Sequence, residues 1–230
     1  MKAITKKKTT VARQRPADKP GRRVLAVINP KGGSGKSTLA FNLAVELSKK
    51  YDVTVIDLDY QKSLTLFDYN RRGLGMEPFN LMAVNGVKEF KQFITAATGY
   101  IIIDTHAIDS DATHEAMKAA DFILSPTNDC YLDLCGLLAF KDILKKVSTR
   151  TRRIKAHVIA NRIRPNTAGY TTIEKFVNAH DDYFEIFKTQ LTERADYRDA
   201  FAQGKSVCEI KGRKAAADEF KKLLKEVEAL

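Results

Sequence analysis

The chain has 230 residues, of which 44% are hydrophobic and 29% charged, so it is long enough for one sizeable core but too short for two full domains. The net charge is +11, and residues 1–23 hold most of it, with nine basic residues against Asp18 alone. The sequence shows neither an apolar run of the roughly 20 residues that span a membrane nor the apolar core of a secretion signal. We therefore expect one globular domain in the cytoplasm.

Residues 1–22 are rich in Lys, Arg and Thr, contain two prolines and offer almost nothing apolar to bury. Such a segment cannot order itself by burial, so it predicts a flexible basic tail ahead of a folded domain over residues 23–230. The tail is either a contact arm for nucleic acid or a solubilising leader, and the sequence leaves both open.

A glycine-rich loop joins the first predicted strand to the first predicted helix. The strand covers residues 24–28 (VLAVI), the loop residues 29–38 (NPKGGSGKST), and apolar residues then recur at helical spacing. The glycines let backbone N–H groups converge on an anion, while Lys36 and Ser37 supply a cation and a hydroxyl for phosphates and Mg²⁺. A dinucleotide-binding loop is the alternative, but its third glycine would fall at Thr38. The loop therefore predicts a nucleoside triphosphate with a metal ion.

The loop departs from the strict P-loop spacing, because Pro30 stands where a glycine is required and a lysine follows it. This pattern resembles the deviant Walker A box, KGGxGK[ST], of the ParA/MinD family of partition and cell-division ATPases. The resemblance implies a homodimer that closes on ATP and Mg²⁺, in which Lys31 reaches the partner subunit's nucleotide and Lys36 stabilises phosphoryl charge. The residues implied to contact ATP are Gly32, Gly33, Ser34, Gly35, Lys36, Ser37 and Thr38.

A second buried strand is predicted over residues 52–57 (DVTVID), with two carboxylates, Asp57 and Asp59, at its end. Carboxylates at a strand end beside a P-loop lie where water and Mg²⁺ are managed, so Asp57 is a candidate metal ligand. Residues 57–61 (DLDYQ) also resemble the family's switch I motif, DxDxQ, which implies that Asp59 orients the attacking water. Tyr60 stands where relatives often have proline. An acidic strand cap is the alternative interpretation.

Beyond this segment we expect a short helix around residues 64–67, a turn at residues 71–73 and a helix over residues 87–97. Residues 99–104 (GYIIID) form an apolar run that ends in one acid, as in a Walker B strand, so Asp104 and Ser37 are expected to hold Mg²⁺. The family usually continues with proline where His106 and Ala107 stand. A separate metal cluster is the less favoured alternative, and its members would be His106, Asp109, Asp111 and His114.

Strands and helices continue to alternate after residue 110, which predicts an α/β fold with a doubly wound, mostly parallel sheet flanked by helices. Further strands are expected at residues 121–126, 156–160 and 183–191. The buried stripe of a long helix is expected to comprise Leu134, Leu137, Leu138, Ile143, Leu144 and Val147. The apolar stripe of the last helix, from Phe220 to Leu230, is interspersed with acids, which favours packing on the core over membrane binding. The three cysteines, Cys130, Cys135 and Cys208, are expected to be buried thiols rather than a disulfide in a reducing compartment.

Basic residues gather in two later segments. Residues 145–155 (KKVSTRTRRIK) contain six basic residues and no acid, which indicates either a solvated loop or a surface for DNA. Residues 193–204 resemble the late family segment whose basic residues contact DNA, and Asn161 matches the asparagine that reads the adenine edge. The candidate DNA contacts are Arg150, Arg152, Arg153, Arg194 and Arg198.

These features together favour a ParA-type partition ATPase that binds DNA without sequence preference as an ATP-dependent dimer on the nucleoid. A ParB-like or other adaptor protein would stimulate its slow hydrolysis of ATP. A MinD-like membrane-associated ATPase and a P-loop enzyme that acts on a small metabolite remain alternatives.

Overall fold

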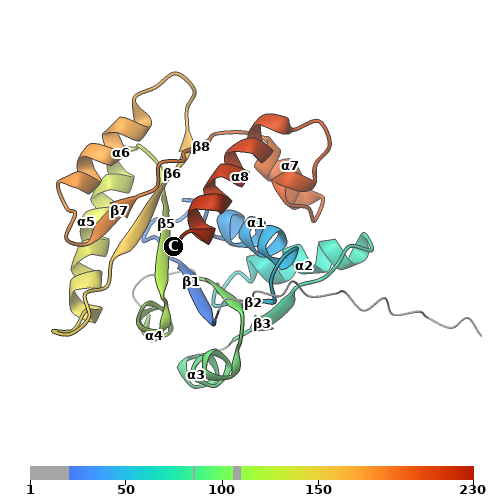
Figure 1. The fold of residues 1–230 in the computed structure, drawn as a ribbon, viewed down its shortest axis with the longest axis horizontal. Helices are drawn as coiled ribbons and strands as arrows, with labels where there is room; N and C mark the ends of the chain where they lie inside the picture. The colour runs from blue at the N-terminus through green and yellow to red at the C-terminus, as the bar shows by residue number, and fades with distance from the viewer. Residues whose placement is uncertain (1–20, 85, 106–109) are drawn as a thin grey trace, which may run out of the picture.

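The computed structural model describes residues 21–84, 86–105 and 110–230, which fold into a parallel sheet with helices on both faces (Figure 1). The strands are β1 (Arg23–Val27), β2 (Val53–Asp57), β3 (Asn80–Ala83), β4 (Tyr100–Asp104), β5 (Phe122–Thr127), β6 (Ala156–Ile163), β7 (Phe184–Ile186) and β8 (Leu191–Thr192). The helices are α1 (Lys36–Ser48), α2 (Ser63–Gly73), α3 (Val87–Ala96), α4 (Asp111–Ala119), α5 (Tyr131–Val147), α6 (Gly169–Asn178), α7 (Asp196–Ala202) and α8 (Lys214–Glu228), with a 3-10 turn η1 (Val207–Glu209) before the last. Residues 1–20 of the expected tail, and His106 and Asp109 of the alternative metal cluster, lie outside the described residues.

The strand order is β3-β2-β4-β1-β5-β6-β7, with β8 paired to β6, and all the strand pairs found are parallel. The doubly wound sheet is therefore confirmed. β1 and β2 run parallel as expected, but β4 lies between them. The register pairs Asp104 with Val27 on one side and with Asp57 on the other. The carboxyl ends of these three strands therefore meet at one edge of the sheet, where ligands of such folds bind.

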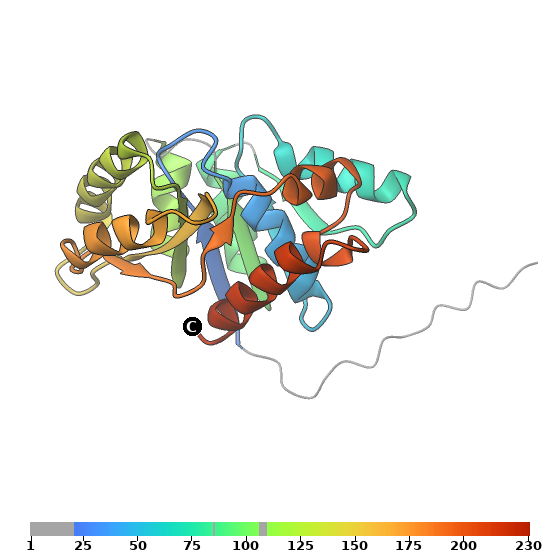
Figure 2. The same cartoon turned by 90° about the horizontal axis from the view of Figure 1, so that it is seen from above.

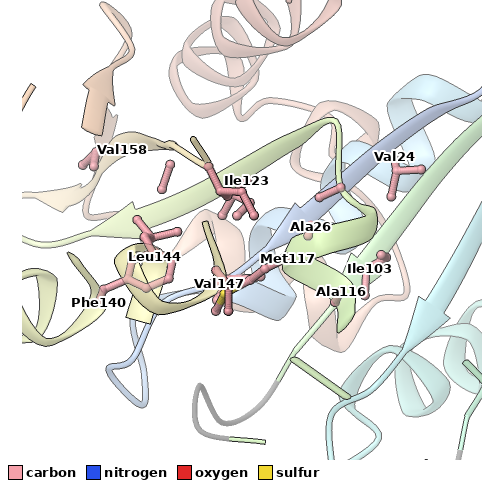
Figure 3. Packing of buried hydrophobic residues seen from close by; sticks show 14 of the residues in the cluster. Val24, Ala26, Ile103, Ala116, Met117, Ile123, Phe140, Leu144, Val147 and Val158 are labelled. Carbon is pink, nitrogen blue, oxygen red and sulfur yellow. The ribbon is translucent and has the colours of Figure 1, made fainter. Parts of the chain in front are cut away.

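Alternate residues of β1 point into two separate cores. Val24 and Ala26 pack with Ile103 of β4, Met117 of α4 and helices α3, α5 and α6 on one face (Figure 3). Their neighbours Leu25 and Val27 pack on the opposite face with α1 and α8 (Figure 2). Because both faces are covered, the strands read as continuous apolar runs rather than alternating ones.

Two expected elements end differently because tertiary contacts override local sequence. Residues 71–73, expected as a turn, form the last turn of α2, where buried Arg71 binds Glu209 from far along the chain. The strand expected over residues 183–191 is two short strands, β7 and β8. β3 was not predicted, because its four residues at the sheet edge are half-buried or exposed and carry no apolar alternation.

The burial of several side chains corrects the sequence analysis. Leu138, expected in the buried stripe of α5, is 43% exposed. The cysteines are free thiols as expected, but Cys130 is exposed and Cys135 and Cys208 are only half-buried. Within the described part of the chain, no helix combines the length and the apolar character needed to cross a bilayer.

Candidate nucleotide-binding site

The glycine-rich loop turns directly from β1 into α1 and depends on glycine at two positions. Gly33 and Gly35 have φ angles of +77° and +95°, a region in which L side chains are strained. A Cβ on Gly35 would also overlap the side-chain nitrogen of Asn161. Gly35 caps α1, so the free N–H groups of the first helical turn face the loop. This backbone forms an anion site without any contribution from side chains.

Lys36 extends across the inside of the loop. Its Nζ donates to the Lys31 carbonyl at 3.0 Å, and the residue is only 8% exposed. Burial lowers the pKa of Lys36, while the nearby carboxylates of Asp104 and Asp59 oppose that shift. The lysine therefore places its amino group between the phosphate loop and both acids, where a terminal phosphate must lie.

Asn29 anchors the start of the loop, a role that the sequence analysis did not identify. Its Nδ2 donates to the Pro126 carbonyl and to the hydroxyls of Ser125 and Thr127 at the end of β5. Its Oδ1 accepts from the N–H of Lys31 at 2.8 Å. These partners lie almost 100 residues away, so local sequence gives no signal for the contact.

Asp57 and Asp59 organise the loop between β2 and α2. Asp57 is fully buried, and its carboxylate accepts from the N–H of Asp59 at 3.0 Å and from the N–H and hydroxyl of Thr65 at 3.2 and 2.9 Å. Asp59 accepts from the N–H of Gln61 at 2.8 Å and lines the cavity described below. Asp57 thus holds the loop that presents Asp59, and a metal-binding role for Asp57 stays a prediction.

Asp104 differs from Asp57 although the two are paired in register. It is fully buried, and neither carboxylate oxygen has a hydrogen-bond partner among the described residues. Burial raises the pKa of Asp104 to about 8, although the neighbouring Ser37 hydroxyl and Lys36 act in the opposite direction. A buried carboxylate without partners is costly unless a cation satisfies it, and hard oxygen ligands suit Mg²⁺. The chain therefore fits Mg²⁺ between Asp104 and Ser37, directly or through water.

A cavity of about 710 Å³ opens over the loop, in the size range of cofactor sites. One wall consists of the loop from Gly32 to Thr38 together with Asp59 and Gln61. The opposite wall is the segment from Thr192 to Arg198 and Phe201 of α7. Asn161 and Arg162 line it between the two walls. The cavity therefore brings the predicted phosphate-binding residues and the predicted adenine contact into one site.

Asn161 and Arg162 hold the loop from above. The Asn161 Nδ2 donates to the Ser34 carbonyl at 2.7 Å, which buries the side chain against the loop. Arg162, whose φ is +56°, donates to the Gly33 carbonyl at 2.9 Å and pairs with Glu193 at 3.5 Å. The sequence analysis missed Arg162, although its position next to Asn161 at a strand end was an available signal.

Lys31 is half-buried beside the start of α5. Burial raises the pKa of Asp133 there, and the charges of Lys31 and Arg162 act against that rise. Lys31 therefore faces Asp133 of its own subunit, while its backbone carbonyl holds Lys36.

The five candidate DNA contacts do not form one surface, which corrects the grouping made from sequence. Arg150, Arg152 and Arg153 precede β6, whereas Arg194 and Arg198 follow β8 and line the cavity. β8 pairs with the far end of β6, a strand of eight residues and so about 25 Å long. The two groups therefore lie at opposite edges of the sheet. The alternative metal cluster finds no support either, since no metal-binding group of acids, His and Cys occurs in the described segments.

Comparisons with known proteins agree with this geometry. A family model described as the CobQ/CobB/MinD/ParA nucleotide-binding domain matches residues 25–207. The chain is 28% identical over 212 residues to the maintenance of carboxysome distribution protein A of Halothiobacillus neapolitanus, across 88% of this chain and 95% of that protein. It is 29% identical over 208 residues to protein ParA of Rhizobium radiobacter, across 85% and 91%. The fold is similar to that of an McdA variant from Cyanothece in complex with ATP, with a TM-score of 0.69, 18% identity and coverage of 91% and 97%.

Proposed function

This chain belongs to the CobQ/CobB/MinD/ParA nucleotide-binding family, and on that premise we propose that it is a ParA-type partition ATPase. It binds ATP and Mg²⁺ between two subunits, hydrolyses ATP slowly, and uses the cycle of dimer formation and release to position a cargo. The observation that carries the proposal is the convergence of Lys36, Asp59 and the unpartnered carboxylate of Asp104 on the phosphate loop.

The residues divide the chemistry of hydrolysis among them. Water attacks the γ-phosphorus, the bond to the β,γ-bridging oxygen breaks, and ADP and phosphate leave. Asp59 orients the attacking water, and Lys36 stabilises the charge that develops on the transferred phosphoryl group. Ser37 and Asp104 hold Mg²⁺, which neutralises phosphate charge when bound. Asn161 contacts the adenine.

Exposed apolar side chains at the nucleotide edge support a dimer closed over the site. Tyr60, Tyr131 and Leu132 are 88%, 77% and 60% exposed, and they follow β2 and β5 at the same edge as the phosphate loop. Large exposed apolar groups that gather near a site are typical of protein interfaces. In the closed dimer Lys31 leaves Asp133 and reaches the nucleotide of the partner subunit.

Dimer formation is tested by light scattering with a non-hydrolysable ATP analogue and Mg²⁺. The wild type should double in mass, and Lys31→Ala should stay a monomer. Lys88→Ala, at an exposed position of α3 away from the site, is the matched control and should dimerise. If Lys31→Ala dimerises as well as the control, Lys31 has no role across the interface.

The names of the relatives suggest two cargo classes, plasmid or chromosomal DNA and a protein compartment such as the carboxysome. In both cases we propose that the dimer binds nucleoid DNA non-specifically and that a ParB-like or other adaptor on the cargo stimulates hydrolysis. Affinity capture of the ATP-locked Asp59→Ala dimer from the native cell would identify the adaptor. An adaptor bound to DNA supports the first class, and a shell or compartment protein supports the second.

A further inference from the structure

A buried arginine ties the helix that follows Asp59 to the opposite wall of the nucleotide cavity. Arg71, in the last turn of α2, is 5% exposed. Its guanidinium donates to the Glu77 carbonyl at 2.7 Å, to the Gly204 carbonyl at 2.8 Å, and to the two carboxylate oxygens of Glu209 at 2.8 and 3.1 Å. This bidentate pair fixes direction as well as distance.

The other end of α2 is bound to the catalytic loop. The N–H of Lys62 donates to the Asp59 carbonyl at 3.0 Å, and Thr65 donates twice to the Asp57 carboxylate. α2 has eleven residues and is therefore about 16 Å long. Because a helix of this length moves as a rod, a displacement at Arg71 reaches the loop that presents Asp59.

The partners of Arg71 belong to residues 204–209, which are also fixed to α1. The Ser206 hydroxyl donates to Glu46, and the N–H of Val207 donates to the Asn42 side chain at 2.7 Å. Glu209 accepts from the N–H of Ser206 at 2.9 Å in addition to Arg71. Gly204 approaches so closely that a Cβ would lie 2.8 Å from the Arg71 backbone. One short segment therefore joins α2 to the helix that begins at the phosphate loop.

The same segment continues directly from α7, which lines the cavity with Tyr197, Arg198 and Phe201. The Phe201 ring lies 5.4 Å from Phe41 of α1 and 5.5 Å from Phe67 of α2. Three elements that face the nucleotide thus share one joint.

We propose that Arg71 is a positioning residue: it holds α2 on residues 204–209, so that the α7 wall and Asp59 respond together when nucleotide binds. The inference rests on the proposed ATPase function. A lysine at position 71 keeps the charge but lacks the planar fork that reaches Glu209 and two carbonyls at once. Geometry at Asp59 then changes while the phosphate loop is untouched, and small misplacements of a water-orienting group reduce turnover more than binding.

The test compares steady-state ATP hydrolysis by full-length Arg71→Met, Arg71→Lys and Glu209→Gln at a temperature at which all are folded. Arg71→Met should lower kcat by about tenfold or more and change KM by less than about threefold. Arg71→Lys should resemble it, Glu209→Gln should show a milder loss, and Arg71→Met with Glu209→Gln should be no worse than Arg71→Met alone. Ile173→Val, in the core on the other face of the sheet, is the control for a general loss of stability.

Hydrogen exchange gives a readout that does not depend on turnover. In the wild type a non-hydrolysable ATP analogue should slow exchange both at residues 195–201 and at residues 59–66, whereas in Arg71→Met only the first segment should respond. Unchanged kcat in Arg71→Met, or protection of residues 59–66 equal to that of the wild type, overturns the inference. A wild type that binds the analogue but never hydrolyses ATP contradicts the proposed function instead, and the exchange comparison still decides the role of Arg71.

Discussion

Asp57 and Asp104 show that partners, rather than position, decide what a buried carboxylate does. Both are fully buried and face each other in adjacent strands. Asp57 accepts hydrogen bonds from Asp59 and Thr65, whereas Asp104 has none in the described structure. Asp57 is therefore satisfied by the fold, and Asp104 requires a proton or a cation.

This difference predicts how stability depends on pH when metal and nucleotide are absent. Between the ordinary carboxyl value near 4 and its folded pKa of about 8, Asp104 keeps a proton that the unfolded chain releases. The folded state then binds more protons, so stability falls as pH rises through this range. From pH 5 to 8 the wild type should lose about 2 to 4 kcal/mol more unfolding free energy than Asp104→Asn. Urea unfolding in a chelator measures this, and parallel pH profiles for the two proteins would contradict it.

A second prediction at this scale concerns Asp59. Its position on the cavity wall predicts that Asp59→Ala lowers kcat by about 100-fold or more, while ATP binding changes little. The reason is that orienting water acts on the transition state rather than on the bound ground state. Fluorescent ATP-analogue titration and single-turnover hydrolysis separate the two quantities. Equal losses of binding and turnover would assign Asp59 to metal binding or folding instead.

The residues that the sequence could and could not reveal differ in the range of their contacts. The phosphate loop is local, so the spacing of Gly33, Gly35 and Lys36 was sufficient to predict a phosphate site. Asn29 and Arg71 act through partners about 100 residues or more away. Neither residue belongs to a short motif, so only the folded chain shows what it does.

At the scale of elements, strands and helices buried on a full face were predicted, and those defined by tertiary contacts were not. β1 and β4 carry continuous apolar runs, whereas β3 has no such pattern at the sheet edge. α2 extends through residues 71–73 because Arg71 gains buried partners there, which overrides the local turn signal of a glycine. Propensity is a weak guide wherever such contacts decide.

α8 supplies the prediction at this scale, because its apolar stripe is buried against the core and not free for a membrane. Phe220 and Val227 are fully buried with α1. Phe220→Ala should therefore cost about 3 to 5 kcal/mol of unfolding free energy. Lys221→Ala, at the exposed neighbouring position, should stay within about 0.5 kcal/mol of the wild type. Chemical denaturation tests both, and a small effect of Phe220→Ala together with vesicle binding by the wild type would favour the membrane-associated alternative.

The molecule as a whole has two functional edges, and its basic residues are divided between them. The carboxyl edge of the sheet holds the phosphate loop and Arg198, whereas Arg150 and Arg153 precede β6 at the amino edge. The described chain enters at this amino edge too, because Arg23 opens β1 and its guanidinium donates to the Glu228 carbonyl at 3.4 Å. A contact with DNA at the amino edge therefore leaves the nucleotide edge free for a partner subunit.

This division predicts opposite outcomes for two exposed arginines. Non-specific affinity falls with salt at a slope of about −0.9 per phosphate contacted, so the slope counts contacts. Arg150→Gln should reduce the slope by about one contact per subunit and leave the KM for ATP unchanged. Arg198→Gln should raise the KM for ATP, because its side chain lines the cavity, and alter DNA binding only through the nucleotide. Arg152 is unsuitable for this purpose, since it donates to the Lys118 and Ala120 carbonyls and its loss would disturb the end of α4.

The measurement is a titration of random-sequence duplex at several salt concentrations, with and without the ATP analogue. Deleting residues 1–20, which hold seven basic residues, should lower the slope in both nucleotide states, because a tail is attached to every monomer. Binding that depends on ATP should survive that deletion, since dimerisation doubles the folded surface and fixes its orientation. If Arg150→Gln and Arg198→Gln change the salt slope equally and leave the KM for ATP alone, the two edges act as one DNA surface. If the full chain binds no DNA in any nucleotide state, the partition proposal fails, because a dimer that cannot hold the nucleoid has nothing against which to position its cargo.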